Sequence, residues 1–275
     1  MKLLSKKIHS YPILARLGIF ILALLFIWLP FAVPIYLLLQ EDDPNLTTIL
    51  TMGILFILFL LLVKLWGKYV YDNHHIFRSY GLVASRRNFF YLLRGLAITF
   101  CLTWLLFGVE ALFGWVVFQP PNMSLVKLVL EGLLSAIAIG FAEELFFRGW
   151  LLAELERDFS PPTSTAINGI VFAVLHFIKP ISQIIRGLVT FPALVLLGVS
   201  LVWAKRSHQN LLGICIGVHG GFVWAYYVLN VGQMITYTEV VPQWITGIDQ
   251  NPIAGLMGLL FLGVFAYFIK DKKKN

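Results

Sequence analysis

The sequence is poor in charged residues and in cysteine. Only 13% of its 275 residues are Asp, Glu, Lys or Arg, whereas 59% are hydrophobic. A polar surface cannot be built from so few charges around a core of this size, which excludes a soluble enzyme and a disordered regulator. Both cysteines, Cys101 and Cys215, lie in apolar runs, which excludes a disulfide-stapled secreted module. We therefore expect an integral membrane protein.

Recognisable nucleic-acid modules and several protease motifs are also missing. The net charge of +7 is not accompanied by a basic or aromatic platform for nucleic acid, so we expect membrane lipid and not nucleic acid as a partner. No His-Glu-x-x-His, Gly-x-Gly-Asp or Gly-x-Ser-x-Gly motif occurs. These absences exclude zinc proteases of the His-Glu-x-x-His type and the aspartate and serine proteases that carry the other two motifs.

Long hydrophobic runs dominate what is present. A helix needs roughly 20 apolar residues to cross the hydrocarbon core of a bilayer. Such stretches predict about eight transmembrane helices in an all-α, multi-pass fold, at residues 15–39, 46–66, 95–118, 125–149, 164–180, 187–204, 210–230 and 252–270.

Basic residues gather at both ends of the chain: Lys2, Lys6, Lys7 and Arg16 at the amino end, and Lys270, Lys272, Lys273 and Lys274 at the carboxyl end. Since cytoplasmic segments carry an excess of Lys and Arg, both termini are expected to be cytoplasmic. This orientation requires an even number of spans. With this orientation, the loop after the fifth span lies outside the cytoplasm. It departs from the bias, because it carries Lys179 and Arg186. Plasma and organelle membranes are not distinguished by this pattern.

The predicted fourth span contains three charged residues, Glu143, Glu144 and Arg148. An Asp, Lys or Arg at mid-bilayer costs on the order of 2.5–3.5 kcal/mol, so such residues need partners or a function. Glu144 and Arg148 are four residues apart and share a helix face, which allows them to pair. Glu143 is rotated by about 100° from Glu144, so its carboxylate is free to point elsewhere.

Two histidines lie at comparable depths in other predicted spans, His176 in the fifth and His219 in the seventh. Glycines recur every four residues beside His219, a spacing that allows a neighbouring helix to approach closely. A single membrane histidine, or a single Glu-Arg pair, is usually structural. One glutamate and two histidines on three spans can instead supply a general base and oxyanion stabilisers, or three ligands for a metal.

These residues resemble the signature of a known family. Glu143-Glu144-x-x-x-Arg148, followed by Phe172-x-x-x-His176 and then His219, is similar to the CPBP family of CAAX prenyl endopeptidases and bacteriocin-processing proteins. The resemblance covers roughly residues 125–230 and implies a bundle like that of the type II CAAX proteases. It divides the chain into an amino-terminal part at 1–124, a catalytic core at 125–230 and a carboxyl-terminal part at 231–275.

The resemblance implies an endopeptidase that cleaves near the carboxyl terminus of a protein or peptide, prenylated or not. Glu143 would activate a water, His176 would hold it, and His219 would stabilise the oxyanion. Three further residues would support and orient this set, namely Glu144, Arg148 and Phe172. The cofactor is left open between none and a divalent metal such as zinc, with Glu143, His176 and His219 as its ligands.

One position departs from the family pattern. The family places Asn or Asp four residues after the last His, whereas this chain has Val223, which has no polar side chain. Loss of one oxyanion donor typically costs 10²–10³ in rate. A catalytically impaired scaffold or regulator of other membrane proteins is therefore a second hypothesis. A proton-coupled transporter is a third, although the chain lacks the paired, interrupted spans of transporter repeats.

Overall fold

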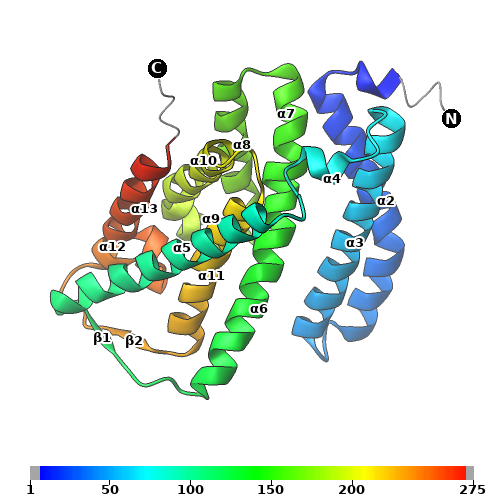
Figure 1. Ribbon diagram of the computed structural model, residues 1–275. Coiled ribbons are helices and arrows are strands. Elements are labelled where there is room, and N and C mark those ends of the chain that lie inside the picture. The colour runs from blue at the N-terminus through cyan, green and yellow to red at the C-terminus, as the bar shows by residue number, and fades with distance from the viewer. Residues whose placement is uncertain (1–6, 271–275) are drawn as a thin grey trace, which may run out of the picture. The chain divides into compact units, whose positions relative to one another are not determined.

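A computed structural model describes residues 7–270, most of which are helical (Figure 1). The lysines expected to orient the termini at positions 2, 6 and 272–274 lie outside these residues. The elements used below are α2 (Ile13–Leu39), α3 (Pro44–Val70), α4 (Ile76–Ser79), α5 (Arg86–Leu112), β1 (Val116–Phe118), α6 (Leu125–Glu144), α7 (Leu152–Asp158), α8 (Pro161–Leu175), α9 (Ile181–Gly187), α10 (Phe191–Ser207), α11 (Gly213–Val231), β2 (Ile235–Tyr237), α12 (Gln243–Thr246) and α13 (Leu256–Ile269).

The chain forms two compact units, one ending at Ser79 and the other beginning at Tyr80. The first unit is a helical hairpin of α2 and α3. Asp43 caps the start of α3, because its side chain accepts a hydrogen bond from the backbone N–H of Leu46. Phe20 of α2 is fully buried and meets the rings of Phe59 and Trp66 edge-on, which joins the two helices.

The helices have the length and surface of a membrane protein. Six helical segments of the described chain are long and apolar enough to span a bilayer, and α8 and α13 are shorter apolar helices. Large apolar side chains such as Leu14 (81% exposed) and Phe26 (79%) face outward, as lipid contact requires and water does not favour. The protein is an integral, multi-pass membrane protein, as the composition predicted.

The third helix of this length lies closer to the amino terminus than the predicted span at 95–118. Helix α5 starts nine residues earlier, because Ser85 caps it by accepting a hydrogen bond from the Asn88 N–H. It ends at Leu112, and Gly114 then turns the chain with a positive φ of 71°. Residues 116–118 instead pair antiparallel with 235–237, a short strand pairing within the all-helical fold that the sequence predicted.

The second unit is organised around α11, whose glycines let two helices approach it closely. A Cβ at Gly217 would lie 2.0 Å from the backbone carbonyl oxygen of Leu92 in α5. A Cβ at Gly213 would lie 2.2 Å from the backbone carbonyl oxygen of Asn88 in the same helix. On another side, a Cβ at Gly140 of α6 would lie 3.0 Å from the carbonyl oxygen of Ile216. Backbone therefore packs on backbone, as the glycine spacing predicted. This packing brings His219 against α6.

We predict that Gly217→Ala destabilises the protein, because the added methyl group forces α5 and α11 apart. Overpacking of this kind typically costs about 1–3 kcal/mol. Thermal unfolding in detergent should show a lower midpoint than the parent. Gly108→Ala is the matched control, because it also lies within a helix but a Cβ there meets no atom within 4 Å. Equal midpoints for the two variants would contradict the packing argument.

Candidate active site

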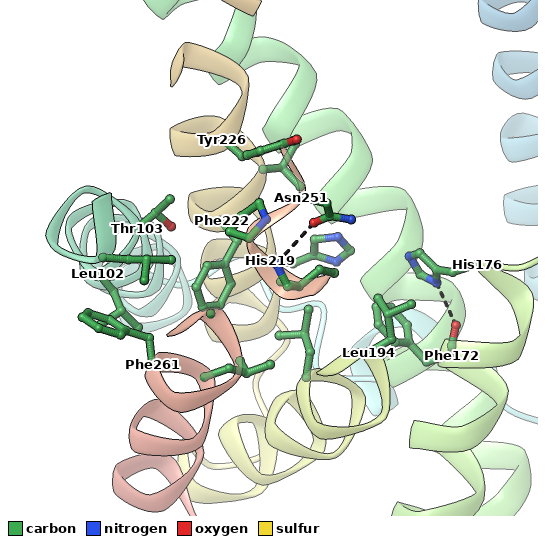
Figure 2. A pocket seen from close by; sticks show the side chains of 17 residues that line it. Leu102, Thr103, Phe172, His176, Leu194, His219, Phe222, Tyr226, Asn251 and Phe261 are labelled. Carbon is green, nitrogen blue, oxygen red and sulfur yellow. Dashed lines mark hydrogen bonds between the residues drawn. The ribbon is translucent and has the colours of Figure 1, made fainter. Parts of the chain in front are cut away.

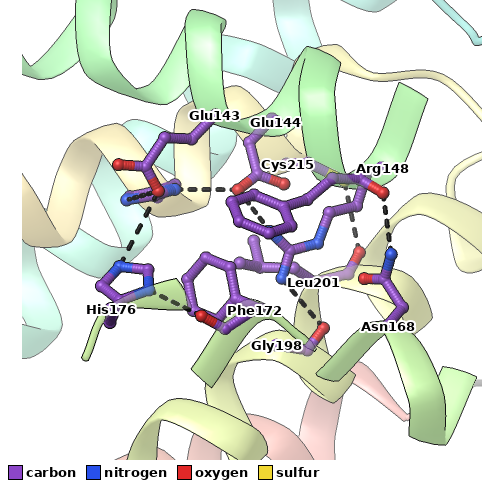
Figure 3. A network of polar contacts seen from close by, with 11 residues as sticks. Glu143, Glu144, Arg148, Asn168, Phe172, His176, Gly198, Leu201 and Cys215 are labelled. Atoms are coloured by element: carbon purple, nitrogen blue, oxygen red, sulfur yellow. Dashed lines mark hydrogen bonds and ion pairs between the residues drawn. The ribbon is translucent and has the colours of Figure 1, made fainter. Parts of the chain in front are cut away.

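The two adjacent carboxylates lie at the end of α6, where the helix changes its geometry. Residues Leu145–Leu151 form a π-helical segment that joins α6 to α7. Such segments widen the helix locally and are frequent at functional sites. Figure 3 shows Glu143 and Glu144 leaving the helix in different directions, as their 100° separation requires. The two carboxylates therefore have different neighbours, apart from His219, which lies near both.

The Glu144 carboxylate is fully buried and accepts hydrogen bonds from two side chains. Its Oε1 accepts a hydrogen bond from Nη1 of Arg148 at 2.8 Å and another from Nδ1 of His219 at 2.8 Å. A carboxylate paired with Arg can only accept, so Nδ1 of His219 carries a proton. Nε2 of His219 is consequently the ring atom that is left for other chemistry.

Arg148 is also fully buried and connects three helices. Besides Glu144, its Nη2 donates to the carbonyl oxygen of Gly198 in α10 at 3.1 Å. The guanidinium lies 4.4 Å from the centre of the Phe172 ring of α8, a cation–π distance (Figure 3). Phe172 is therefore held between Arg148 and the site, and its ring packs 4.4 Å from that of His176.

His176 is positioned by the end of its own helix. It is the C-cap residue of α8, and its backbone N–H bonds to Ala173 instead of Phe172. The Phe172 carbonyl is thus one of the orphan acceptors of a helix end. Nδ1 of His176 lies 2.7 Å from that oxygen, and since a carbonyl only accepts, Nδ1 is the donor. The Nε2 of His176 is left to face Glu143.

The three residues expected to carry the chemistry converge on one oxygen atom. Oε2 of Glu143 lies 3.8 Å from Nε2 of His176 and 3.9 Å from Nε2 of His219. This oxygen is buried and accepts no hydrogen bond from residues 7–270. Two atoms bridged by one water, at about 2.8 Å from each, can lie up to roughly 5 Å apart. The spacing therefore accommodates a water between the carboxylate and each ring.

A tetrahedral zinc ion fits this arrangement less well. Ligand atoms at about 2.0–2.1 Å from zinc lie about 3.3 Å apart, which is shorter than the two Glu143–histidine separations. Within the described part of the chain, no three His, Cys, Asp or Glu side chains are placed to hold a metal ion.

A cavity of about 300 Å³ lies beside the two histidines (Figure 2). Its walls are mostly apolar and come from α5, α8, α10, α11 and α13. Val223 lines it one helical turn after His219, and Asn251 lines it from the loop before α13. Figure 2 shows His176, His219 and Asn251 around this space. The histidines thus have access to a volume that a substrate side chain can occupy.

All six residues singled out from the sequence lie in this one region. Glu143, His176 and His219 form the converging set described above, and Glu144, Arg148 and Phe172 lie directly behind it. Sequence reasoning did not identify Asn251. Its only local signal is the Asn-Pro pair before the last apolar run, which indicates a turn or a helix cap. Its place at the cavity depends on the tertiary fold.

The site combines two carboxylates and two histidines inside an apolar multi-pass bundle, a class of site that suits acid–base chemistry within a membrane. Residues 125–225 match the model of a family described as type II CAAX prenyl endopeptidase, Rce1-like. The predicted family is thereby confirmed over this part of the chain, which holds all six of these residues. No curated protein and no solved structure matches the chain.

We predict that Arg148→Met destabilises the fold by about 3–5 kcal/mol, because the fully buried Glu144 carboxylate loses the arginine with which it is paired. Chemical denaturation in detergent micelles measures the change. Adding Glu144→Gln to Arg148→Met should restore part of the loss, since the buried charge is then removed. Arg186→Met is the control, because the Arg186–Asp249 pair is exposed and contributes little. A loss no greater than that of the control would contradict the role given to the buried pair.

Proposed function

We propose that this protein is an intramembrane endopeptidase that hydrolyses a peptide bond through a water activated by Glu143. The observation that carries the proposal is the convergence of two Nε2 atoms, at 3.8 and 3.9 Å, on one buried oxygen of Glu143 beside a cavity. The family match over residues 125–225 supports the same reaction class.

In the first step, a water bridges Glu143 and His176. The Nε2 of His176 is the acceptor in the neutral ring, because Nδ1 donates to the Phe172 carbonyl. The Glu143 carboxylate takes a proton from this water as its oxygen attacks the carbonyl carbon of the substrate. A C–O bond forms, and the electron pair of the C=O π bond moves onto the carbonyl oxygen.

His219 faces the developing negative charge. With Nδ1 bonded to the Glu144 carboxylate, a protonated ring directs its second N–H, at Nε2, toward the site. In that state the charges of Glu143 and Glu144 are opposed by those of Arg148 and the His219 imidazolium, which lowers the cost of holding charge at membrane depth.

In the second step, the oxyanion collapses and the C–N bond breaks. Glu143 returns its proton to the leaving nitrogen, so it serves first as base and then as acid. The products are a carboxylic acid and an amine, and the site returns to its starting protonation state. The mostly apolar cavity beside the histidines suits an apolar substrate group, either a hydrophobic side chain or a prenyl chain near the carboxyl terminus.

We further propose that eight helices cross or enter the membrane, with both termini cytoplasmic. Hydrogen bonds gather the basic segments at one end of the second unit: Arg87 bonds to Gln209, Leu212 to Gly81, and Arg206 to Glu156. Two basic residues departed from the charge bias, Lys179 and Arg186. Their segment is bonded through Arg186 to Asp249, in the acidic loop before α13. This arrangement agrees with the positive-inside rule for the remaining loops.

We predict that Glu143→Gln abolishes cleavage while the fold is kept. The amide cannot accept the proton of the attacking water, and loss of such a base typically costs 10²–10⁴ in rate. The measurement is cleavage of fluorescent peptides with and without a carboxyl-terminal prenyl-cysteine motif, using protein in proteoliposomes. Glu131→Gln on the same helix is the control, because Glu131 is about half exposed and pairs with the exposed Lys127. Equal rates for Glu143→Gln and the parent would favour the scaffold hypothesis.

We predict that cleavage does not depend on a bound metal, because the Glu143–histidine separations exceed those of a tetrahedral zinc site. Dialysis of the purified protein against EDTA or 1,10-phenanthroline should leave the rate within about twofold of the parent rate. Elemental analysis by mass spectrometry should find less than a stoichiometric amount of zinc. A rate that falls with the chelator and returns on adding zinc would contradict this.

A further inference from the structure

The apolar residue at position 223 leaves the proposed site with one oxyanion donor from α11, His219. Two other polar side chains of the cavity are already engaged. The Thr103 hydroxyl donates to the carbonyl oxygen of Thr99 at 2.9 Å, and the Tyr226 hydroxyl lies 3.4 Å from the carbonyl oxygen of Gln250. Asn251 is the remaining polar residue that lines this cavity besides the histidines.

The Asn251 side chain is oriented by a capping hydrogen bond. Its Oδ1 accepts from the backbone N–H of Ile253 at 3.3 Å, as a cap does at the start of a helical turn. The amide has two ends, and this bond occupies the acceptor end. Its NH₂ group makes no hydrogen bond to residues 7–270, and the side chain lies at the cavity in Figure 2. The donor end is therefore available.

The loop that carries Asn251 is held in place by close backbone packing. A Cβ at Gly258 would lie 2.0 Å from the Pro252 carbonyl oxygen, and a Cβ at Gly255 would lie 2.6 Å from the Gly247 nitrogen. Helix α13 has 14 residues, about 21 Å, which is shorter than a bilayer core of about 30 Å. A loop before so short a helix reaches membrane depth, where irregular backbone is tolerated when it lines a cavity.

We propose that the Asn251 amide donates a hydrogen bond to the carbonyl oxygen of the scissile bond, together with His219. It thereby supplies a second donor, which the apolar side chain of Val223 cannot supply. The inference rests on the proposed function. Asn251 transfers no proton, and it stabilises the negative charge that forms on this oxygen as the C=O π bond opens.

The decisive variant is Asn251→Asp. The carboxylate keeps an acceptor for the Ile253 N–H, so the cap is retained, but it has no NH₂ group and adds a negative charge near the oxyanion. We expect kcat to fall by a factor of 10²–10³ or more, with KM changed less than threefold. Asn251→Ala should lower kcat by a similar factor. Thermal unfolding should show that Asn251→Asp keeps the parent midpoint.

A second-site change tests the same idea by gain of activity. Val223 lines the same cavity, one turn from His219, so Val223→Asn places an amide there. Combined with Asn251→Ala, it should raise kcat at least tenfold above that of Asn251→Ala alone. A residue that merely shapes the loop would not be replaced by an amide on another helix.

Asp249→Asn is the loop control, because the Asp249 side chain faces the exposed Arg186 and not the cavity. Its kcat should equal that of the parent. If Asn251→Asp cleaves at the parent rate while Glu143→Gln is inactive, the inference is overturned and the proposed function stands. If Glu143→Gln cleaves at the parent rate, the proposed function fails and this inference fails with it.

Discussion

The second unit depends on one buried carboxylate, that of Glu144. It accepts from Arg148 and from His219 at 2.8 Å each, so a single oxygen atom links α6, the π-helical segment and α11. Arg148 extends the link to α10 through the Gly198 carbonyl. A fully buried ion pair is costly to desolvate, and Oε2 of Glu144 and Nε of Arg148 find no hydrogen-bond partner among residues 7–270. The same hydrogen bonds determine which ring nitrogen of His219 carries a proton and in which direction the ring points.

A second constraint is the length of two helices. Helix α8 has 15 residues and α13 has 14, so each is about 21–22 Å long and shorter than the bilayer core. Both have an end at the cavity, where His176 caps α8 and Asn251 precedes α13. Helix ends expose unpaired backbone groups, which lipid cannot satisfy. The short helices thus place polar groups and irregular backbone around an interior space instead of facing lipid.

The apolar runs and the charged residues within them could be recognised in the sequence, because burying a polar group in a bilayer costs much free energy. Glu143, Glu144, Arg148, His176 and His219 were therefore identified before their contacts were known. The start of α5 was not, because the Ser85 cap extends that helix into a basic segment that hydropathy assigns to a loop. Asn251 was also missed, since an Asn-Pro pair between apolar runs indicates a turn and says nothing about which cavity the turn faces.

The same reasoning explains why the departure at Val223 does not by itself argue against catalysis. An oxyanion donor must lie at a defined point in space, and its place in the chain is secondary. Helix α11 is enclosed by α5 and α6 through glycine contacts, which leaves Val223 facing the cavity with the loop of Asn251. An amide held by its own capping bond is oriented without further side-chain partners. A loop that is fixed by close backbone packing can therefore supply from outside the helix a group that the helix lacks.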